Sequence, residues 1–317
     1  MAQILITGAH GFIGKHLAKH LAALGHHVSG LGHGIWPKAE ASHWGVADWV
    51  NGDVHTTNLR TLQARHEPDL VFHLAGGSTV SAAIANPRED FFRTVASTVE
   101  LLDWIRLDVP TVRLIAVSSA AVYGSGIRGL IAENAVGVPY SPYGHHKRMM
   151  ESLCRSYADT YGLDFRVARL FSVYGPELKK QLLWDMCTRL AAGESPVVLG
   201  GTGQELRDWT HVNDVVIALA RLAFDGDTAL RSQAINIGTG VATPVQAIAQ
   251  TVIEAWSEYS GSLEKPNLRF SGQSRQGDPF SLVADTARLE RMGFSCSVPL
   301  AAGVASFVNW FHLSAAH

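Results

Sequence analysis

The stretch ILITGAHGFIGKHLAKHLAALG, residues 4–25, joins a short apolar run to a glycine-rich turn and then to a helical pattern. Gly8, Gly11 and Gly14 stand in the turn and at the start of the predicted helix. Glycines there permit a tight turn and let a pyrophosphate approach the helix N-terminus, whose free N–H groups favour negative charge. The stretch therefore predicts a dinucleotide-binding strand, turn and helix.

Strands and helices alternate along the rest of the first half. Short runs rich in Val, Ile and Leu between amphipathic helices indicate a parallel sheet covered on both faces. We predict an α/β fold with a doubly wound parallel (Rossmann) sheet and a smaller, interleaved C-terminal α/β substrate-binding region. The predicted boundaries are 1–170 for the dinucleotide-binding domain, with a return near 205–240, and 171–317 for the mainly substrate-binding region. Strands are predicted at QILIT, HHVSGL, DLVFHLA, RLIAVSS and DFRVARL, and helices near 12–24, 88–107 and 143–161.

Composition excludes several classes of partner. The 317 residues hold 26 Lys plus Arg and 28 Asp plus Glu, a formal charge of −2, which offers no field for nucleic acid or an anionic membrane. The N-terminus runs directly into the first strand without a targeting segment, so a cytoplasmic protein is expected. Three scattered cysteines suggest neither disulfides nor zinc. His16 and His20 lie one turn apart without a third ligand, so no metal is predicted.

The segment SPYGHHK, residues 141–147, places Tyr143 and Lys147 one helical turn apart on the same face. A free phenol has a pKa near 10 and is a poor base at neutral pH. The lysine charge, together with a cationic nicotinamide ring, would lower that pKa. Tyr143 could then exchange a proton with a sugar hydroxyl. His145 and His146, between them, point to other faces and are expected at the surface.

The Gly-x-x-Gly-x-x-Gly spacing, HLAGGS at 73–78 and Tyr-x-x-x-Lys together resemble the extended short-chain dehydrogenase/reductase family, in its nucleotide-sugar epimerase/dehydratase group. The resemblance implies NAD or NADP as cofactor, a nucleotide-sugar substrate, and a homodimer formed through the helices near 88–107 and 143–161. It assigns catalysis to Ser119, Tyr143 and Lys147. The expected cofactor-binding residues are Gly8, Gly11, Phe12, Ile13, Gly14, His33, Asp53, Val54, Leu74, Ala75, Gly76, Tyr143 and Lys147. The expected substrate-binding residues are Ser119, Ser172, Arg207, Arg275 and Asp278.

The end of the second strand departs from the family pattern. NAD-preferring members carry an acidic residue there that binds the ribose, and this chain has Gly32. Without that carboxylate a 2′-phosphate is not repelled, and His33 or Lys38 could contact one. NAD and NADP both stay open on the sequence.

The residues after Ser119 bear on the reaction. Sugar 4,6-dehydratases resemble this chain but carry Asp and Glu at the next two positions, whereas Ala120 and Ala121 stand here. The chain therefore lacks the acid and the base that elimination of water requires. The uronic-acid decarboxylase branch of the family keeps a glutamate at the second position, so the alanine there also disfavours decarboxylation. Oxidation with return of hydride, or simple reduction of a keto-sugar, needs neither group.

Arg207 and Arg275 match the family's nucleotide-binding arginines. Two guanidiniums from separate loops could bind a diphosphate bidentately. The alternative for Arg207 is a salt bridge with the adjacent Asp208. Leu282 falls where the related epimerases limit the pocket beside the sugar; leucine is intermediate in size there and decides little, and a packing role is the favoured interpretation.

Three hypotheses for function follow. The first is a nucleotide-diphosphate-sugar epimerase, most simply at C4. The second is an NADPH-dependent reductase of a nucleotide 4-keto-6-deoxysugar, which uses the same residues. The third is a non-catalytic dinucleotide-sensing protein on the same fold, although the intact set of Ser119, Tyr143 and Lys147 argues against it.

Overall fold

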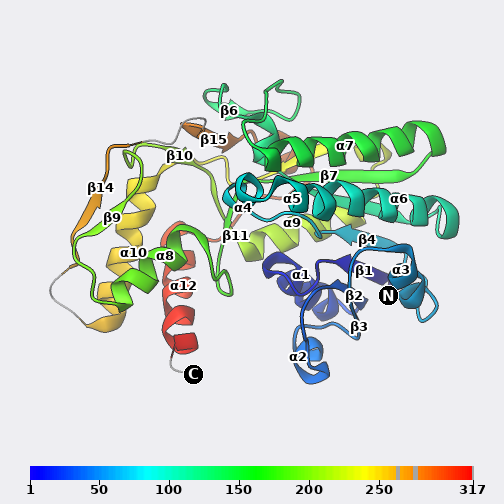
Figure 1. The fold of residues 1–317 in the computed structure, drawn as a ribbon, viewed down its shortest axis with the longest axis horizontal. Helices are drawn as coiled ribbons and strands as arrows, with labels where there is room; N and C mark the ends of the chain where they lie inside the picture. Colours follow the sequence, from blue (N-terminus) through cyan, green and yellow to red (C-terminus); the bar gives the residue numbers. More distant parts are fainter. Residues whose placement is uncertain (262–264, 274–277, 316–317) are drawn as a thin grey trace.

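Seven parallel strands form the central sheet of the protein (Figure 1). The structure is a computed structural model that describes residues 1–261, 265–273 and 278–315. The strands lie in the order β12 (Ala234–Ile237), β7 (Asp164–Leu170), β5 (Arg113–Ser119), β4 (Leu70–His73), β1 (Gln3–Thr7), β2 (His27–Gly32) and β3 (Asp48–Asn51). The order reverses between β1 and β4, which is where doubly wound sheets bind ligands. The predicted fold class is confirmed.

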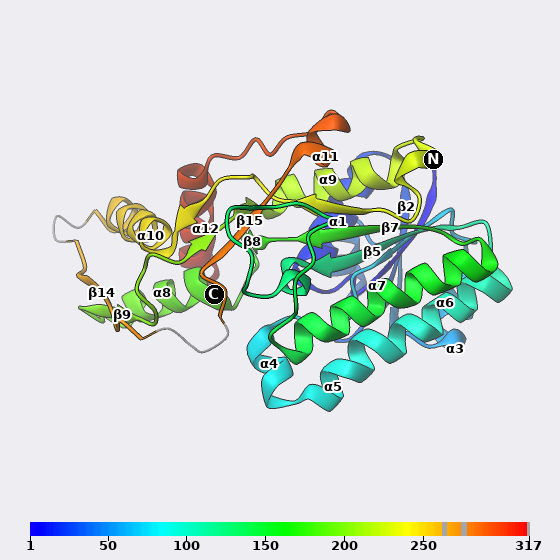
Figure 2. The same cartoon turned by 90° about the horizontal axis from the view of Figure 1, so that it is seen from above.

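Helices cover both faces of this sheet, as Figure 2 shows from above. Ile4 and Ile6 of β1 belong to the core on one face and Leu5 to the core on the other, because successive side chains of a strand point to opposite sides. The first face is covered by α1 (Phe12–Ala23) and α9 (Val212–Phe224). The second is covered by α3 (Thr56–Gln63), α6 (Ser97–Asp108) and α7 (Pro142–Tyr161).

The turn between β1 and α1 requires glycine. Gly8 has φ +74°, in the left-handed region that favours glycine. A Cβ at Gly14 would lie 2.2 Å from the carbonyl oxygen of Gly8. The backbone of the turn therefore packs directly against the first turn of α1, with no room for a side chain.

The helix predicted near 88–107 is interrupted. The chain forms α5 (Pro87–Phe91), then a π-helical stretch (Phe92–Ala96), and then α6. Within the π-helical stretch, Thr94 turns its hydroxyl toward the loop after β4 and accepts a hydrogen bond from the N–H of Gly77 at 2.8 Å. Periodicity predicted the helical character of this segment but not its change of pitch.

The C-terminal part builds a second core beside the sheet (Figure 1, left). Helices α8 (Gln181–Ala191), α10 (Val245–Ser260) and α12 (Leu300–Ala315) surround it. The short strands outside the main sheet are β6 (Leu130–Ile131), β8 (Ser172–Tyr174), β9 (Val197–Leu199), β10 (Leu206–Arg207), β11 (Trp209–His211), β13 (Thr243–Pro244), β14 (Leu268–Phe270) and β15 (Ser281–Ala284). Between them the chain returns to the main sheet through α9 and β12. Among the described residues, no helix has the length and apolar character to cross a bilayer.

Candidate active site

A cavity of about 850 Å³ opens at the C-terminal ends of the sheet strands. The glycine turn forms one of its walls, and Ser119, Tyr143 and Lys147 line another. Every residue predicted to bind the cofactor lines this cavity, namely Gly8, Gly11, Phe12, Ile13, Gly14, His33, Asp53, Val54, Leu74, Ala75, Gly76, Tyr143 and Lys147. The fold thus brings together groups that lie up to 139 positions apart, from Gly8 to Lys147, in one site.

The N-terminus of α1 fits a dinucleotide phosphate. Its N-cap residue is Gly11, which offers no side-chain cap, and the first turn carries no acidic residue. The uncapped N–H groups and the helix dipole therefore favour an anion there. A nicotinamide dinucleotide fits this cavity by the chemistry of its donors, with the phosphates at the glycine turn.

The residues predicted to be catalytic stand at the ends of long elements. Ser119 is the last residue of β5, and Tyr143 lies in the first turn of α7, whose N-cap Ser141 accepts a hydrogen bond from the N–H of Gly144. A Cβ at Gly144 would lie 2.5 Å from the carbonyl oxygen of Ala121, so α7 packs closely on the turn that follows Ser119. This close approach is what holds the phenol near the serine hydroxyl.

Burial and neighbouring charges set the protonation of the pair. Burial raises the pKa of Tyr143, hydrogen bonding with Ser119 lowers it, and the charge of Asp90 raises it. Burial lowers the pKa of Lys147 to about 8, against the charges of Asp90 and Glu151. The Lys147 ammonium donates to the carbonyl oxygen of Val117 at 2.9 Å. In the protein alone, then, Ser119 rather than Lys147 is the group that favours the phenolate.

The prediction for one neighbouring histidine was wrong. His145 is exposed as expected, but His146 is only 9% exposed, and its Nδ1 lies 2.5 Å from Oδ2 of the buried Asp90. His146 follows Tyr143 by three positions and so shares that side of the helix. Helix α5 covers this side, which the sequence of α7 alone does not reveal.

The end of the cavity where the adenosine of a dinucleotide is predicted to bind carries a histidine and a carboxylate. His33 follows Gly32, the last residue of β2, and its Nε2 lies 3.0 Å from Oδ1 of Asp53. Both side chains are mostly exposed, at 67% and 86%. Lys38 opens the short helix α2 (Lys38–His43) and does not line the cavity. Among the described residues that line this end of the cavity, the one basic side chain is therefore an imidazole that already contacts a carboxylate.

Only some of the residues predicted to bind the substrate line the cavity. Ser119, Ser172 and Leu282 line the cavity, while Arg207 lies beyond it on β10. Tyr140 lines the cavity, and the pKa of its phenol is raised by burial and by the charge of Asp278 and lowered by the charge of Arg207. Arg275 lies outside the described residues.

The alternative salt bridge for Arg207 does not form. The carboxylate of Asp208 accepts hydrogen bonds from the N–H groups of Thr239 at 2.7 Å, Gly240 at 2.9 Å and Ala284 at 3.1 Å. Asp208 thus ties together three segments of backbone. Nη1 of Arg207 donates to the carbonyl oxygen of Leu206 at 2.8 Å and to that of Phe280 at 3.4 Å, so Nε and Nη2 are the donors without an acceptor among the described residues.

Sequence reasoning missed several cavity residues. Tyr140, Lys180 and Gln181 line the cavity, and burial lowers the pKa of Lys180. Gln181 has φ +68°, a left-handed conformation that non-glycine residues hold mainly at functional sites. Tyr140 lies just before the Ser141 cap, and Lys180 lies a few residues past the Gly-Pro turn at 175–176; both positions give a weak signal in the sequence.

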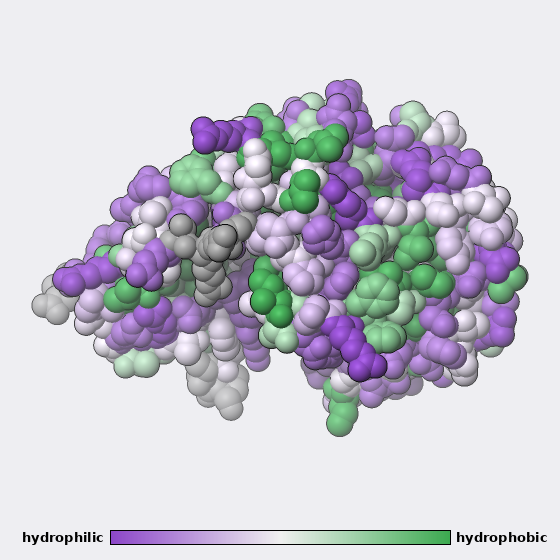
Figure 3. Space-filling model, turned by 45° about the horizontal axis from the view of Figure 1, so that its top comes forward, coloured by the Kyte–Doolittle hydropathy of each residue, from purple (hydrophilic) through white to green (hydrophobic). Residues whose placement is uncertain are grey.

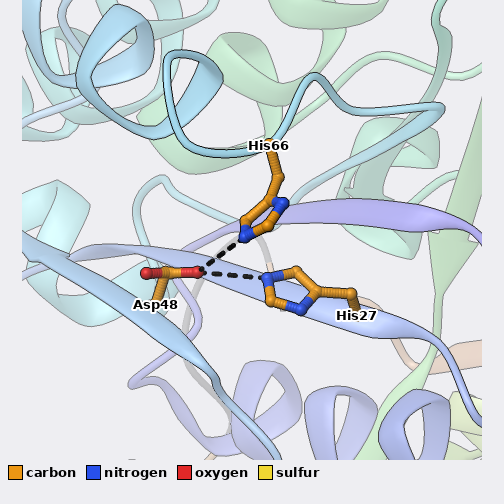
Figure 4. Close-up of side chains that lie close together, drawn as sticks. All are labelled: His27, Asp48 and His66. Atoms are coloured by element: carbon orange, nitrogen blue, oxygen red, sulfur yellow. Dashed lines mark hydrogen bonds and ion pairs between the residues drawn. The ribbon is translucent and has the colours of Figure 1, made fainter.

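One group of possible metal ligands lies elsewhere (Figure 4). Oδ2 of Asp48 is 3.1 Å from Nε2 of His27 and 3.7 Å from Nε2 of His66, and Arg65 donates to the other carboxylate oxygen at 3.1 Å. His27 and Asp48 begin β2 and β3, so the group lies at the opposite edge of the sheet from the cavity. It is separate from the chemistry of the site, and its carboxylate is already balanced by the arginine.

Comparisons with known proteins place the chain in a family. The family model described as the NAD dependent epimerase/dehydratase family matches residues 4–238. The UDP-glucose 4-epimerase of Mycolicibacterium smegmatis is 30% identical over 98% of each chain. Two solved structures are similar at 26% identity. The UDP-glucose 4-epimerase of Thermotoga maritima with UDP-glucose has a TM-score of 0.85, and 99% of each chain is covered. The UDP-glucose 4-epimerase of Thermus thermophilus with NAD has a TM-score of 0.84, and 98% of this chain and 99% of that chain are covered. The chain belongs to the NAD dependent epimerase/dehydratase family.

Proposed function

We propose that this protein is a nucleotide-diphosphate-sugar 4-epimerase that acts by transient hydride transfer to a bound NAD. The observation that carries the proposal is the convergence of Ser119, Tyr143 and Lys147 with the glycine turn in one cavity. Proton exchange at one hydroxyl oxygen is the only acid–base chemistry that this set supplies. Epimerisation at a secondary alcohol needs no more than that.

The roles of the three side chains follow from their positions. A bound nicotinamide dinucleotide supplies a hydride acceptor and donor, and return of the hydride to the other face of the sugar inverts the carbon. Tyr143 takes the hydroxyl proton as the carbon is oxidised and returns it to the same oxygen. Ser119 hydrogen-bonds with the phenol and orients that oxygen. Lys147 holds a buried positive charge that must be kept for activity, so turnover is expected to fall as pH rises above the pKa of about 8.

Dehydration is disfavoured by the same wall of the cavity. Ala120 and Ala121 line it immediately after Ser119. An elimination needs a proton acceptor and donor beside the sugar, and two methyl groups offer neither. This supports epimerisation over dehydration within the family.

NAD is the cofactor that the adenosine end favours. The residues that line it are Gly32, His33, Gly52, Asp53 and Val54. A 2′-phosphate is recognised by arginine or lysine, whereas here the one imidazole pairs with Asp53, whose carboxylate would repel a phosphate. The similar structure from Thermus thermophilus contains NAD.

The substrate is proposed to be a UDP-hexose. The similar proteins named above are UDP-glucose 4-epimerases, and one of the structures holds UDP-glucose. Arg207 and Tyr140 are proposed to bind the diphosphate, since Tyr140 lines the cavity and the charge of Arg207 acts on its phenol. Leu282, on the cavity wall, is proposed to contact the sugar.

A homodimer completes the proposal. Figure 3 shows hydrophobic side chains gathered over the α6 and α7 region of this face. A groove of about 500 Å³ runs there, lined by Val95, His145, Arg148, Met149, Ser152 and Leu153. Two such faces would bury each other around a two-fold axis. Light scattering is expected to give twice the chain mass, and Met149→Glu is expected to shift it to the monomer.

A cytoplasmic location is likewise a proposal. Cys154, Cys187 and Cys296 are all free thiols. Free thiols persist in a reducing compartment. Fractionation of the producing cells would test the location directly.

The deciding experiment starts with the cofactor. Purified protein is denatured and the released dinucleotide identified, and fresh protein is incubated with UDP-, GDP- and dTDP-sugars. We expect NAD in the released fraction and C4-inverted product, without net change in the absorbance of reduced nicotinamide. Stoichiometric consumption of NADPH on a 4-keto-sugar, with no epimerised product, would contradict the proposal and identify a reductase.

A further inference from the structure

A buried pair of ionisable side chains stands behind the catalytic residues and takes no part in the mechanism above. Asp90 is 5% exposed and His146 is 9% exposed. Asp is almost never this buried without a partner, because taking a carboxylate out of water is costly. Here Nδ1 of His146 lies 2.5 Å from Oδ2 of Asp90, and the ring of Phe91 covers the imidazole edge-on at 5.6 Å.

The pair joins the two walls of the cavity that hold catalytic and cofactor-binding groups. His146 directly precedes Lys147 on α7, and Asp90 belongs to α5. The backbone of Gly77, which lines the cavity, rests on the carboxylate: a Cβ there would lie 1.7 Å from Oδ1 of Asp90. Asp90 therefore fixes the spacing between this loop and the helix that carries Tyr143 and Lys147.

Among the charged groups that act on Tyr143 and Lys147, Asp90 is the one that acts on both. Its charge raises the pKa of Lys147 and that of Tyr143. Glu151 also acts on Lys147, but both its oxygens bind Arg169, at 3.0 and 2.7 Å.

The remaining ionisable neighbours contribute no opposing charge. Burial and the charge of Lys147 lower the pKa of His73, on β4, to about 3, so this imidazole stays neutral. Glu89 and Arg93, next to Asp90 along the chain, pair with each other at the surface.

We propose that Asp90, held by His146, is a positioning residue that keeps the Lys147 ammonium charged and fixes it against the Gly77 loop during epimerisation. This inference rests on the function proposed above. It assigns a role to Asp90 through Lys147 and Tyr143, without contact with substrate.

The sign of its effect on activity is determined. The active form needs Tyr143 deprotonated and Lys147 protonated, so activity rises with pH through the first group and falls through the second. A carboxylate raises both pKa values, and its removal lowers both. Loss of the Asp90 charge therefore moves both limbs of the pH profile toward lower pH, whereas a purely structural lesion lowers its height or the melting temperature.

The test is the pH profile of kcat for UDP-sugar epimerisation, with NAD affinity and melting temperature measured in parallel. Asp90→Asn keeps the shape and removes the charge, and both limbs are expected to shift by about one pH unit toward acid. His146→Ala removes the side chain that holds the Asp90 carboxylate in place, and a shift in the same direction is expected. His146→Asn keeps a donor and is expected to restore the wild-type profile. Glu89→Gln, which removes the exposed neighbouring carboxylate, is the matched control.

The outcomes separate this inference from the proposed function. Wild-type protein that turns over no nucleotide sugar refutes the function. Active wild type with unshifted limbs in Asp90→Asn, relative to Glu89→Gln, overturns the role of Asp90. If Asp90→Asn does not fold, the pH profiles of kcat for His146→Ala and His146→Asn are compared. Equal profiles overturn the inference, whereas a shift toward acid in His146→Ala alone supports it.

Discussion

The sheet side of the cavity and the C-terminal region at its margin are built differently. On the sheet side, Ser119 ends a strand of seven residues and Tyr143 and Lys147 stand on a helix of 20 residues, with Lys147 only 4% exposed. On the C-terminal side, Arg207 stands on a strand of two residues beyond the cavity. Proton transfer requires groups held to a fraction of an ångström by packed neighbours, whereas recognition of a ligand tolerates shorter, more variable segments. The difference predicts that changes on the sheet side affect kcat and changes on the C-terminal side affect KM.

The largest effect is expected on the sheet side. Tyr143→Phe removes the proton-transfer group and keeps the ring, so kcat should fall by roughly 10²- to 10⁴-fold while NAD affinity and KM stay near wild type. Steady-state kinetics and NAD titration measure the three quantities. Turnover that is undiminished would refute the mechanism.

The matching change on the C-terminal side is Arg207→Met. A hydrogen bond to a charged group contributes about 1.5–3 kcal/mol, so KM for a UDP-sugar should rise roughly 10- to 150-fold with kcat little changed. Arg207→Lys keeps the charge but not the bidentate geometry, so its KM is expected to lie between those of the wild type and Arg207→Met. A lowered kcat at unchanged KM in Arg207→Met would break the comparison.

The glycine turn should respond through cofactor binding. Gly14→Ala places a Cβ 2.2 Å from a backbone oxygen, which cannot move as a flexible side chain can. Overpacking of this kind costs about 1–3 kcal/mol, and we expect weaker NAD binding and a lower melting temperature. Gly126→Ala, where a Cβ meets no atom within 4 Å, is the control. Equal NAD affinity in both variants would contradict the assignment of the turn.

The smallest effect is expected at Leu282 on the cavity wall. Leu282→Ala enlarges the space proposed for the sugar, and a hydrophobic contact of this size changes selectivity by about 1–3 kcal/mol at most. The ratio of kcat/KM for UDP-N-acetylglucosamine over UDP-glucose should rise by roughly tenfold or less. An unchanged ratio would place the sugar elsewhere in the cavity.

The elements of the sheet side were largely predictable. The structure confirms the strands QILIT, RLIAVSS and DFRVARL at Gln3–Thr7, Arg113–Ser119 and Asp164–Leu170. Their residues are apolar and bounded by turn formers, so local preference and tertiary burial agree. On the C-terminal side most strands have two to four residues. Such strands carry little periodicity, and only their pairing partners define them.

Contacts between elements were the part that the sequence did not reveal. Asp208 was weighed as an ion-pair partner of its neighbour, yet its carboxylate binds three backbone N–H groups from distant segments. The 88–107 helix was predicted without its π-helical stretch. In both cases the outcome depends on a partner that is far away along the chain.

The sequence by itself determined the glycine turn, the order of strands and helices, and the spacing of Tyr143 and Lys147, because backbone conformation and periodicity are local properties. Only the tertiary structure decided that His146 is buried against Asp90, that Tyr140 reaches the cavity, and that Arg207 lies at its margin. The burial and the electrostatic environment of a side chain depend on which other elements pack against it, and the neighbouring residues along the chain do not specify those elements.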